Sequence, residues 1–466
     1  MEETRPPLME VTQALVRSAK AREFRFGKKT AIVAAQHMIW QTVDLFRTIA
    51  DLGVSPENIF VVGKIYSNAP QVIDALNRIG ISVTGTTTPP PDEFNKYFQR
   101  DIARLWETAE RHLSRRQISR IIVLDDGGEC IINTPPHLLQ RYGMAGVEQT
   151  SMGMVVFEKR PPPYAVMSWA RSAVKLLIEG PIFAHGLVNK VQTEFLKQGV
   201  LRDKEVGIIG LGSIGTATAK LTLLQRNKVF FYDLNPKVVI SPELQDRITR
   251  LDSLEELMTR CEYVFGCCGC SPFQDKWPMK YRPDIKLFSG SSGDQEFGSI
   301  IRDLRKHKRF WVDSESRDIR WEGPYGPMFI GYRGYPYNFT AHNGEPIPTR
   351  IVQIETGGLL ASLIQARTHL ALYEHGYELN GGIHRIAPEA QRFVYERWLN
   401  AMAKHNIDFT ERFAYEPAML RAAAGNMEWY DANSEPKTTR GYTPLTRIEE
   451  TMRNLLGNSQ ERTANS

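Results

Sequence analysis

The chain has 466 residues, 42% of them hydrophobic, and a net charge of +5 from 58 basic and 53 acidic side chains. This length predicts about two or three domains, and the scattered basic residues exclude a nucleic-acid-binding protein. No apolar run approaches the ~20 residues that span a bilayer, and the polar N-terminal segment predicts no signal peptide. We therefore expect a cytoplasmic protein with no membrane partner.

The first part of the chain has the pattern of a parallel α/β sheet. Residues 1–26 predict a helical lead-in, and four apolar runs with helical patterns between them predict parallel strands. The predicted strands are 31–35, 58–63, 81–84 and 120–124, the clearest helices are 40–52 and 93–113, and a further helix is expected at about 164–179.

Residues 206–235 contain a glycine-rich turn between a predicted strand and a predicted helix. The order is strand, Gly210-x-Gly212-x-x-Gly215, helix, second strand and then Asp233. Gly210 suits a tight turn, Gly212 lets the backbone approach a pyrophosphate, and Gly215 lets the helix pack closely on the strand. An acid at the position of Asp233 can bind the ribose diol of NAD. No arginine follows it within several residues, so the sequence predicts NAD rather than NADP.

Further strands are expected at 263–267, 286–289 and 310–312, and helices at 350–374 and 388–405. The predicted fold class is α/β, with two doubly wound parallel-sheet domains and a helical C-terminal segment. The expected boundaries are 1–185 for the first part of a substrate domain, 186–345 for a Rossmann NAD domain, 346–425 for a helical return and 426–466 for a tail. The cysteine cluster at 267–270 lacks a second ligand pair for zinc. It is interpreted as thiols at the end of a buried strand, and no metal is expected.

Polar clusters follow two of the predicted strands in the first region. His37 comes after residues 31–35, and Asp125 and Asp126 come after residues 120–124. In an open parallel sheet, ligands bind beyond the carboxyl ends of the strands. The sequence therefore predicts that these side chains face a ligand at one sheet edge.

Taken together, these features resemble the S-adenosylhomocysteine hydrolase family over residues 7–410, as a divergent member. The segments that carry the resemblance are 37–42 (His-Met-x-x-Gln-Thr), 124–129, 148–153, Ser172-x-x-Lys175-x-x-x-Glu179, the glycine turn with Asp233, Asn338 with Gly344-x-Pro346, and 380–388. The resemblance implies a homo-oligomer, dimer or tetramer, that holds NAD tightly and acts on a small-molecule nucleoside.

The resemblance also implies the role of each site residue. Lys175 would take a hydroxyl proton, which needs a pKa lowered from its usual value. Glu179 would orient it, Asp126 would move a C4′ proton, and His37 would protonate the leaving group. Gln149 completes the expected catalytic set. The expected substrate-binding residues are Gln41, Ile39, Thr150 and Glu345. The expected cofactor-binding residues are Thr150, Ser151, Gly210, Gly212, Ser213, Ile214, Gly215, Asp233, Cys268, Ser292 and Asn338.

The sequence departs from the family at positions around the substrate. Gln149 replaces a glutamate, Glu179 an aspartate, Ile39 a threonine, and Ser292 and Glu345 each a histidine. The tail that reaches a neighbouring subunit in the family is unrecognisable, with Lys437 and Tyr442 as candidate replacements. These departures favour an altered substrate for a retained oxidation–elimination chemistry.

The function expected from the resemblance is NAD-dependent oxidation at C3′ of an adenine-type nucleoside, then 5′ elimination and re-reduction. Dehydration, as in a nucleoside dehydratase of nucleoside antibiotic biosynthesis, is the specific hypothesis. The alternatives are a true S-adenosylhomocysteine hydrolase, an NAD-binding regulatory homologue with weak or no catalysis, and a 2-hydroxy-acid dehydrogenase. The last shares the glycine turn, but we find no His/Arg pair at suitable positions in the cofactor domain.

Overall fold

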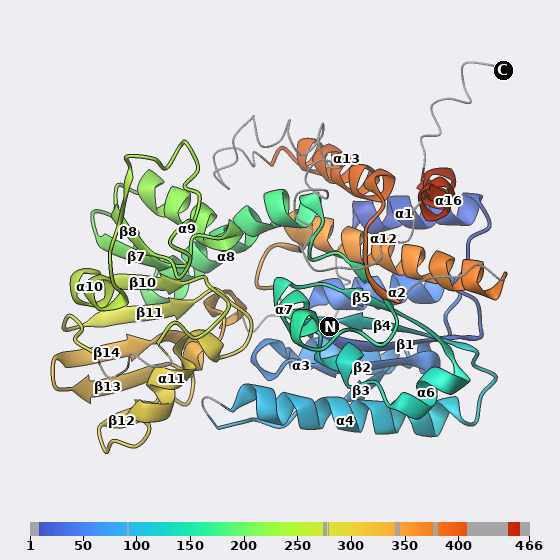
Figure 1. The fold of residues 1–466 in the computed structure, drawn as a ribbon, viewed down its shortest axis with the longest axis horizontal. Coiled ribbons are helices and arrows are strands. Elements are labelled where there is room, and N and C mark those ends of the chain that lie inside the picture. The colour runs from blue at the N-terminus through green and yellow to red at the C-terminus, as the bar shows by residue number, and fades with distance from the viewer. Residues whose placement is uncertain are drawn as a thin grey trace, which may run out of the picture.

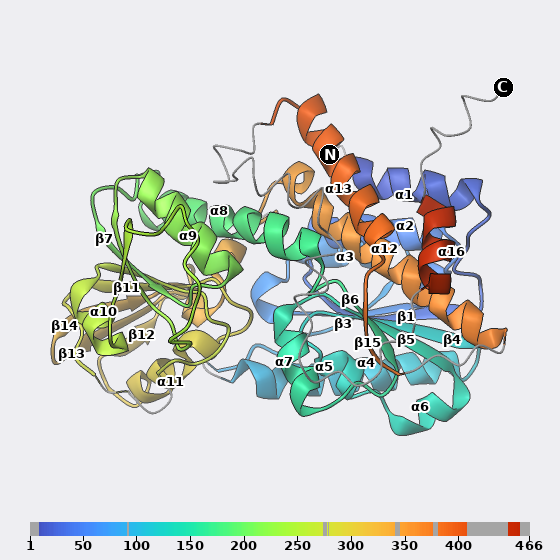
Figure 2. The same ribbon diagram turned by 45° about the horizontal axis from the view of Figure 1, so that its top comes forward.

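The computed structural model describes residues 9–90, 93–273, 277, 279–340, 345–375, 381–407 and 446–456. Two sheets form two lobes that lie side by side, with helix α8 (Gly180–Lys190) running between them (Figures 1 and 2). The fold class is therefore α/β with two doubly wound domains, as predicted. The exact domain boundaries stay predictions.

The first sheet, in the described residues, has seven parallel strands in the order β15-β6-β5-β4-β1-β2-β3. The strands are β1 (Thr30–Gln36), β2 (Ile59–Gly63), β3 (Ser82–Thr84), β4 (Arg120–Asp125), β5 (Gly143–Glu148), β6 (Ala165–Ser168) and β15 (Gly382–Arg385). Because strand side chains alternate between faces, Ile32 and Ala34 pack in one core while Ala31 and Val33 pack in the other. Both faces are thus covered, as an all-parallel sheet requires.

Helices cover each face of this sheet. One core contains residues of α1 (Glu10–Ala21), α2 (Trp40–Asp51), α3 (Pro70–Arg78), α12 (Thr349–Glu374), α13 (Pro388–Lys404) and α16 (Thr446–Leu456). The other contains residues of α4 (Phe94–Leu113), α5 (Glu129–Ile132), α6 (Pro136–Arg141) and α7 (Ser151–Lys159). Figure 1 shows α12 and α4 on opposite sides of the strands.

The second sheet has the order β12-β13-β14-β11-β10-β7-β8-β9, with β12 to β14 antiparallel and the remaining pairs parallel. Its strands are β7 (Glu205–Ile209), β8 (Lys228–Tyr232), β9 (Ile248–Arg250), β10 (Tyr263–Gly266), β11 (Ile285–Ser289), β12 (Phe310–Val312), β13 (Ile319–Gly323) and β14 (Gly326–Ile330). Its helices are α8, α9 (Ser213–Leu224), α10 (Leu254–Arg260) and α11 (Gln295–Leu304). Short π-helices, Lys175–Glu179 and Val191–Phe195, flank α8. The 3-10 helices are Pro56–Asn58, Ile65–Ser67, Gly331–Gly334 and Tyr337–Thr340.

The prediction of a helix over 164–179 is wrong in its first half, because residues 165–168 form the buried strand β6. A four-residue apolar run has no periodicity that separates a strand from a buried helix. The sequence pattern also missed β5, β9, β13, β14 and β15. No helix among the described residues has both the length and the apolar character needed to cross a bilayer.

Each sheet has a switch point at which the strand order reverses. In the first sheet β1 has β2 on one side and β4 on the other, and in the second sheet β7 lies between β8 and β10. Ligands of open α/β sheets bind beyond the carboxyl ends of strands at such points. The fold therefore directs attention to the residues that follow β1, β4, β7 and β10.

Candidate functional site

A cavity of about 320 Å³ lies between the two lobes, and both switch points contribute to its lining. The connecting segment that leads into α8 contributes as well. The sequence-predicted residues that line it are His37, Asp126, Gln149, Thr150, Ser151, Lys175, Glu179, Gly212, Ser213, Ile214, Cys268, Ser292 and Asn338. The structure thus brings most of the predicted site together in one space, although their individual roles stay predictions.

The glycine turn has the geometry of a dinucleotide site. Gly210 has φ +88°, and a Cβ built on it would lie 2.7 Å from Cα of Cys268. A Cβ on Gly215 would lie 1.9 Å from the carbonyl oxygen of Gly210, whereas a Cβ on Gly212 would meet nothing within 4 Å. Two glycines are therefore required by packing, and the third keeps open the space in front of the N-terminus of α9, where a pyrophosphate fits.

Asp233 follows β8 and is fixed by backbone amides. Its Oδ2 accepts from the amide of Leu211 at 2.7 Å, and its Oδ1 accepts from the amide of Asn235 at 2.8 Å. These bonds hold a carboxylate beside the glycine turn, as ribose binding requires. Sequence spacing missed Arg250, which reaches across from β9 and donates to the carbonyl oxygens of Asp233 and Asn235 at 3.4 and 3.2 Å.

Glu296 holds the loops after β10 and β11, which line the cavity together with the glycine turn. The sequence did not predict it as a site residue. This buried carboxylate accepts from the amides of Cys268 and Gly269 at 2.7 and 3.3 Å. It also accepts from the hydroxyls of Ser289 and Ser291 at 2.7 and 2.9 Å. Burial raises its pKa although these donors oppose the rise. Glu296 thereby ties the loop after β10 to the loop after β11.

His37, Asp126 and Lys64 form a buried cluster at the first switch point. Nε2 of His37 lies 3.2 Å from Oδ2 of Asp126, and the other oxygen of Asp126 pairs with the ammonium of Lys64. Nδ1 of His37 lies 2.6 Å from the hydroxyl of Ser67, and its ring stacks on Phe339 with centroids 4.3 Å apart. Both ring nitrogens of His37 are therefore engaged.

The charges of this cluster follow from burial and from its ion pairs. Burial alone would raise the pKa of Asp126, but Lys64 and His37 outweigh it and hold that pKa below its usual range. Burial lowers the pKa of His37 more than Asp126 raises it, with Lys64 adding to the lowering, so the imidazole is neutral at neutral pH. The cluster therefore consists of an ammonium, a carboxylate and a neutral imidazole.

Two further carboxyls lie beneath this cluster. Burial raises the pKa of Asp125 to about 7 and the pKa of Glu148 well above its usual value. Glu148 accepts from the amides of Gly127 and Thr150 at 3.1 and 2.7 Å, and Asp125 accepts from the amide of Ile131 at 2.8 Å. These acids hold the loops after β4 and β5 in place.

Lys175 lies on the connecting segment between two glutamates. Its Nζ is 2.5 Å from Glu179 and 3.0 Å from Glu355, and Glu355 also accepts from the indole of Trp169 at 2.8 Å. Burial would lower the pKa of Lys175, but the two carboxyls outweigh it and raise that pKa. These neighbours therefore do not supply the lowered pKa that proton abstraction by Lys175 would need, and its role stays a prediction. Burial and Glu355 raise the pKa of Glu179 well above its usual value.

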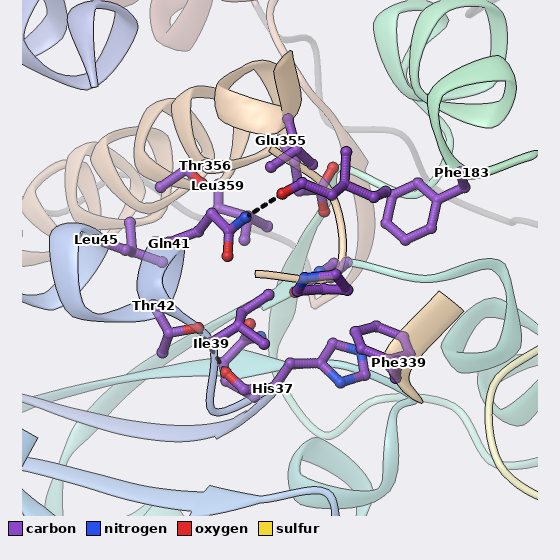
Figure 3. A pocket seen from close by; sticks show the side chains of 15 residues that line it. His37, Ile39, Gln41, Thr42, Leu45, Phe183, Phe339, Glu355, Thr356 and Leu359 are labelled. Atoms are coloured by element: carbon purple, nitrogen blue, oxygen red, sulfur yellow. Dashed lines mark hydrogen bonds between the residues drawn. The ribbon is translucent and has the colours of Figure 1, made fainter. Parts of the chain in front are cut away.

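A mostly apolar pocket opens beside these groups. Figure 3 shows Phe183 and Phe339 on one side of it and Leu359 on another, with His37 at its base. Gln41 donates to the carbonyl oxygen of Ile347 at 3.3 Å. The pocket also contains three buried polar side-chain atoms without hydrogen-bond partners, namely Nε2 of Gln36, Oε1 of Gln41 and Oε1 of Gln149. Apart from Glu355, which pairs with Lys175, its surface offers neutral hydrogen-bonding groups and apolar contact to a ligand, and Ile39 is part of it.

Some predicted residues occupy other places. Oε1 of Glu345 accepts from the amide of Thr349 at 2.7 Å at the start of α12, so this carboxylate caps a helix. Thr150 lines the cavity and also caps α7, because its hydroxyl accepts from the amide of Gly153 at 3.3 Å. Lys437 and Tyr442 lie outside the described residues.

Comparison with known proteins found a family model that matches the cofactor-binding part of the chain. Residues 184–276 match the model of the NAD binding domain of D-isomer specific 2-hydroxyacid dehydrogenases. Two uncharacterized proteins from strains of Mycobacterium tuberculosis, MT0113 and Rv0104, are each 28% identical over 336 residues, which is 72% of this chain. The chain spans 63% of the length of these relatives.

Two solved structures are more distantly similar. A 2-hydroxyacid dehydrogenase from Ketogulonicigenium vulgare has a TM-score of 0.34 and 11% identity, over 77% of this chain and 99% of its own. The apo D-lactate dehydrogenase from Escherichia coli has a TM-score of 0.31 and 13% identity, over 47% of this chain and 77% of its own.

These findings establish the cofactor and correct the expected family. The matched domain and the geometry of the glycine turn agree on NAD, and the match supports an enzyme of the dehydrogenase class. The expected membership in the S-adenosylhomocysteine hydrolase family is wrong, because the matched model is that of 2-hydroxyacid dehydrogenases. The nucleoside oxidation–elimination function fails with it, and so do the hydrolase, dehydratase and antibiotic-pathway interpretations. The matched NAD binding domain is that of the 2-hydroxyacid dehydrogenases, the alternative that the sequence analysis set aside for want of a His/Arg pair.

Proposed function

We propose that this protein is an NAD-dependent dehydrogenase that interconverts a hydroxyl and a carbonyl group of a small molecule in the cavity between the lobes. The observation that carries the proposal is the position of Lys175. Its ammonium lines the same 320 Å³ cavity as Gly212 and Ser213 of the cofactor turn. NAD supplies the electron acceptor for the C–H bond beside the hydroxyl, and the protein must supply a group that moves the hydroxyl proton.

Lys175 is the proposed proton-transfer group. Glu179 and Glu355 raise its pKa, so at neutral pH its Nζ carries the proton that a carbonyl oxygen must receive during reduction. Oxidation of the alcohol requires the neutral amine, which higher pH favours. The protein is therefore expected to reduce carbonyl compounds more readily than it oxidises alcohols near neutral pH.

The charges around the cavity favour an uncharged substrate. Lys175 is paired with Glu179 and Glu355, and Lys64, which is not among the lining residues, is paired with Asp126. Among the described lining residues, no arginine and no other lysine faces the cavity. A substrate carboxylate would therefore have to compete with a glutamate for its cation, whereas the apolar pocket suits an uncharged group.

A 2-hydroxy acid is the second candidate substrate, because the matched domain belongs to enzymes named for that class. Its carboxylate would displace Glu355 or Glu179 from Lys175. Glu179 is suited to release the lysine, because its raised pKa favours the neutral carboxylic acid.

The test is oxidation of NADH by the purified protein with two panels of compounds, uncharged ketones and aldehydes, and 2-oxo acids. Turnover with the 2-oxo acids alone would show that the substrate is an acid and not an uncharged compound. Absence of turnover in both panels would contradict the dehydrogenase. Lys175→Met is expected to lower kcat at least about 100-fold with unchanged NADH affinity.

The matched control is Lys190→Met. Lys190 lies on α8, pairs with Glu194 at 3.3 Å four residues on, and has a side chain about as exposed as that of Lys175, 15% against 16%. This variant should keep the wild-type kcat. An equal loss in both variants would point to folding rather than proton transfer.

A further inference from the structure

Two cysteine sulfurs meet in the loop that follows β10. Sγ of Cys268 lies 3.7 Å from Sγ of Cys270 and 3.1 Å from the carbonyl oxygen of that residue. Both thiols are half-buried, whereas Cys130 and Cys261 are buried. Gly269 between the pair has φ +68° and no side chain to obstruct a closer approach. A disulfide needs sulfurs about 2.0 Å apart, so only a small movement of this loop separates the dithiol from the bond.

One of these cysteines is part of the wall that holds the cofactor turn. The backbone of Cys268 packs directly on Gly210, where an added Cβ would lie 2.7 Å from its Cα. The amides of Cys268 and Gly269 are tied to Glu296. A backbone shift of Cys268 toward Cys270 would therefore disturb its contact with Gly210 or its hydrogen bond with Glu296.

The other cysteine is tied to the same loop by its contact with Cys268. Cys268 and Gly269 line the cavity together with the glycine turn, and Cys270 follows them directly in the chain. A disulfide would therefore form in a loop that contacts the glycine turn through Cys268. The described residues bring no set of three metal-ligating side chains together here or elsewhere, so the pair is interpreted as a dithiol and not as part of a metal site.

We propose that Cys268 and Cys270 form a redox-active dithiol whose oxidation to a disulfide weakens NAD binding. The oxidant is a low-molecular-weight disulfide such as oxidised glutathione. Cys270 attacks one sulfur of the oxidant and releases the first thiol, and Cys268 then attacks Sγ of Cys270 and releases the second. Two protein thiols lose two electrons and two protons, and one small disulfide becomes two thiols.

The local electrostatics suit this order of attack. The hydrogen bond between the two thiols lowers the pKa of Cys270 to about 7, although burial opposes the change. The same contact raises the pKa of Cys268. Cys270 is therefore the thiolate that attacks first at neutral pH, and Cys268 is the thiol that resolves the mixed disulfide.

The experiment compares reduced protein with protein treated with oxidised glutathione. After alkylation and trypsin digestion, Arg260 and Lys276 bound a peptide that contains four of the five cysteines. The reduced peptide should carry four alkyl groups, whereas the oxidised peptide should carry two alkyl groups and one disulfide, which fragment ions place between Cys268 and Cys270. The Kd for NAD, measured by titration calorimetry, should rise at least about tenfold and recover with dithiothreitol.

The control variants separate the pair from other thiols. Cys270→Ser, on a half-exposed loop, should form no such bond and keep its NAD affinity after treatment, while Cys261→Ser should respond like the wild type. Should Cys261→Ser fold poorly, wild-type protein loaded with NAD provides a second test, because bound NAD should slow disulfide formation by reciprocal linkage. A peptide that stays reduced, or a disulfide without change in the Kd for NAD, would overturn the proposal.

Discussion

Nε2 of His37 lies 3.2 Å from Oδ2 of Asp126, and this contact joins the ends of two neighbouring strands. His37 follows β1 and Asp126 follows β4, which pair in parallel. Lys64 follows β2 on the other side of β1 and pairs with the remaining oxygen of Asp126. Strand order alone therefore assembles an ion pair and an imidazole at the switch point, and burial makes the pairing strong.

Removal of Lys64 should destabilise the protein severely. Lys64→Met leaves the buried carboxylate of Asp126 with only a neutral imidazole for a partner, which is expected to reduce the free energy of unfolding by about 3–5 kcal/mol. The pKa of His37 should rise at the same time, because Lys64 no longer opposes its protonation. Urea unfolding and NMR titration of the imidazole measure the two effects.

Lys96→Met is the matched control. Lys96 pairs with Glu93 at 3.1 Å on the surface and is 60% exposed. Its removal should change the free energy of unfolding by no more than about 1 kcal/mol. Equal losses in the two variants would contradict the stabilising role of the buried pair.

The amino-acid sequence predicts the parts of the site that lie close to their own strands. His37 and Asp126 follow apolar runs directly, and the parallel-sheet rule places both at one edge. The glycine turn is readable because each glycine has a packing or approach requirement that the structure confirms for Gly210 and Gly215. The strands β5 and β6 were missed because short runs buried on both faces lack the alternation of a half-exposed strand.

Partners from distant segments were beyond the sequence pattern. Glu355 comes from α12 and meets Lys175 across 180 residues of chain, and Glu296 meets Cys268 across 28. Lys64 follows a strand, as His37 does, but a lone lysine there is more often solvated. The family prediction failed for a different reason. The glycine turn with its acid is common to several NAD-dependent families, and short segments such as Asp-Asp-Gly-Gly also suit ordinary turns.

Two glycines of the turn should respond differently to the same substitution. Gly212→Ala adds a methyl group that meets no protein atom within 4 Å, at an ordinary φ of −73°. It should leave the free energy of unfolding within about 0.5 kcal/mol of wild type and weaken NAD binding at least about tenfold. Gly215→Ala forces a contact with the carbonyl oxygen of Gly210 and should cost about 1–3 kcal/mol of stability. Normal NAD affinity in Gly212→Ala would contradict the placement of the pyrophosphate.

Glu179 should make the wild-type protein less stable as the pH rises. Its folded pKa is raised well above the unfolded value, so the folded state keeps a proton that the unfolded chain loses above about pH 4.3. Glutamine mimics the protonated acid and cannot titrate. The stability of Glu179→Gln relative to wild type should therefore increase with pH, by up to about 1.4 kcal/mol per unit.

Urea unfolding of both proteins between about pH 5 and pH 8 measures this difference. Glu194→Gln is the control, because Glu194 has a 50% exposed side chain and pairs with Lys190. The stability of Glu194→Gln relative to wild type should not increase with pH. A difference between Glu179→Gln and wild type that stays constant with pH would show that Glu179 is ionised in the folded protein.

Asp233 should favour binding of NAD over NADP, whereas Arg250 should reduce this preference. Arg250 contacts the backbone of residues 233–236, so its guanidinium lies where a 2′-phosphate could reach it. The carboxylate of Asp233 repels that phosphate in the wild type. Asp233→Ser removes the repulsion and should weaken NAD binding at least about tenfold while it strengthens NADP binding. The double variant Asp233→Ser with Arg250→Ala should lose the gain in affinity for NADP without recovering the wild-type affinity for NAD. Titration with each dinucleotide measures both affinities. Unchanged preference in Asp233→Ser would place the ribose elsewhere in the cavity.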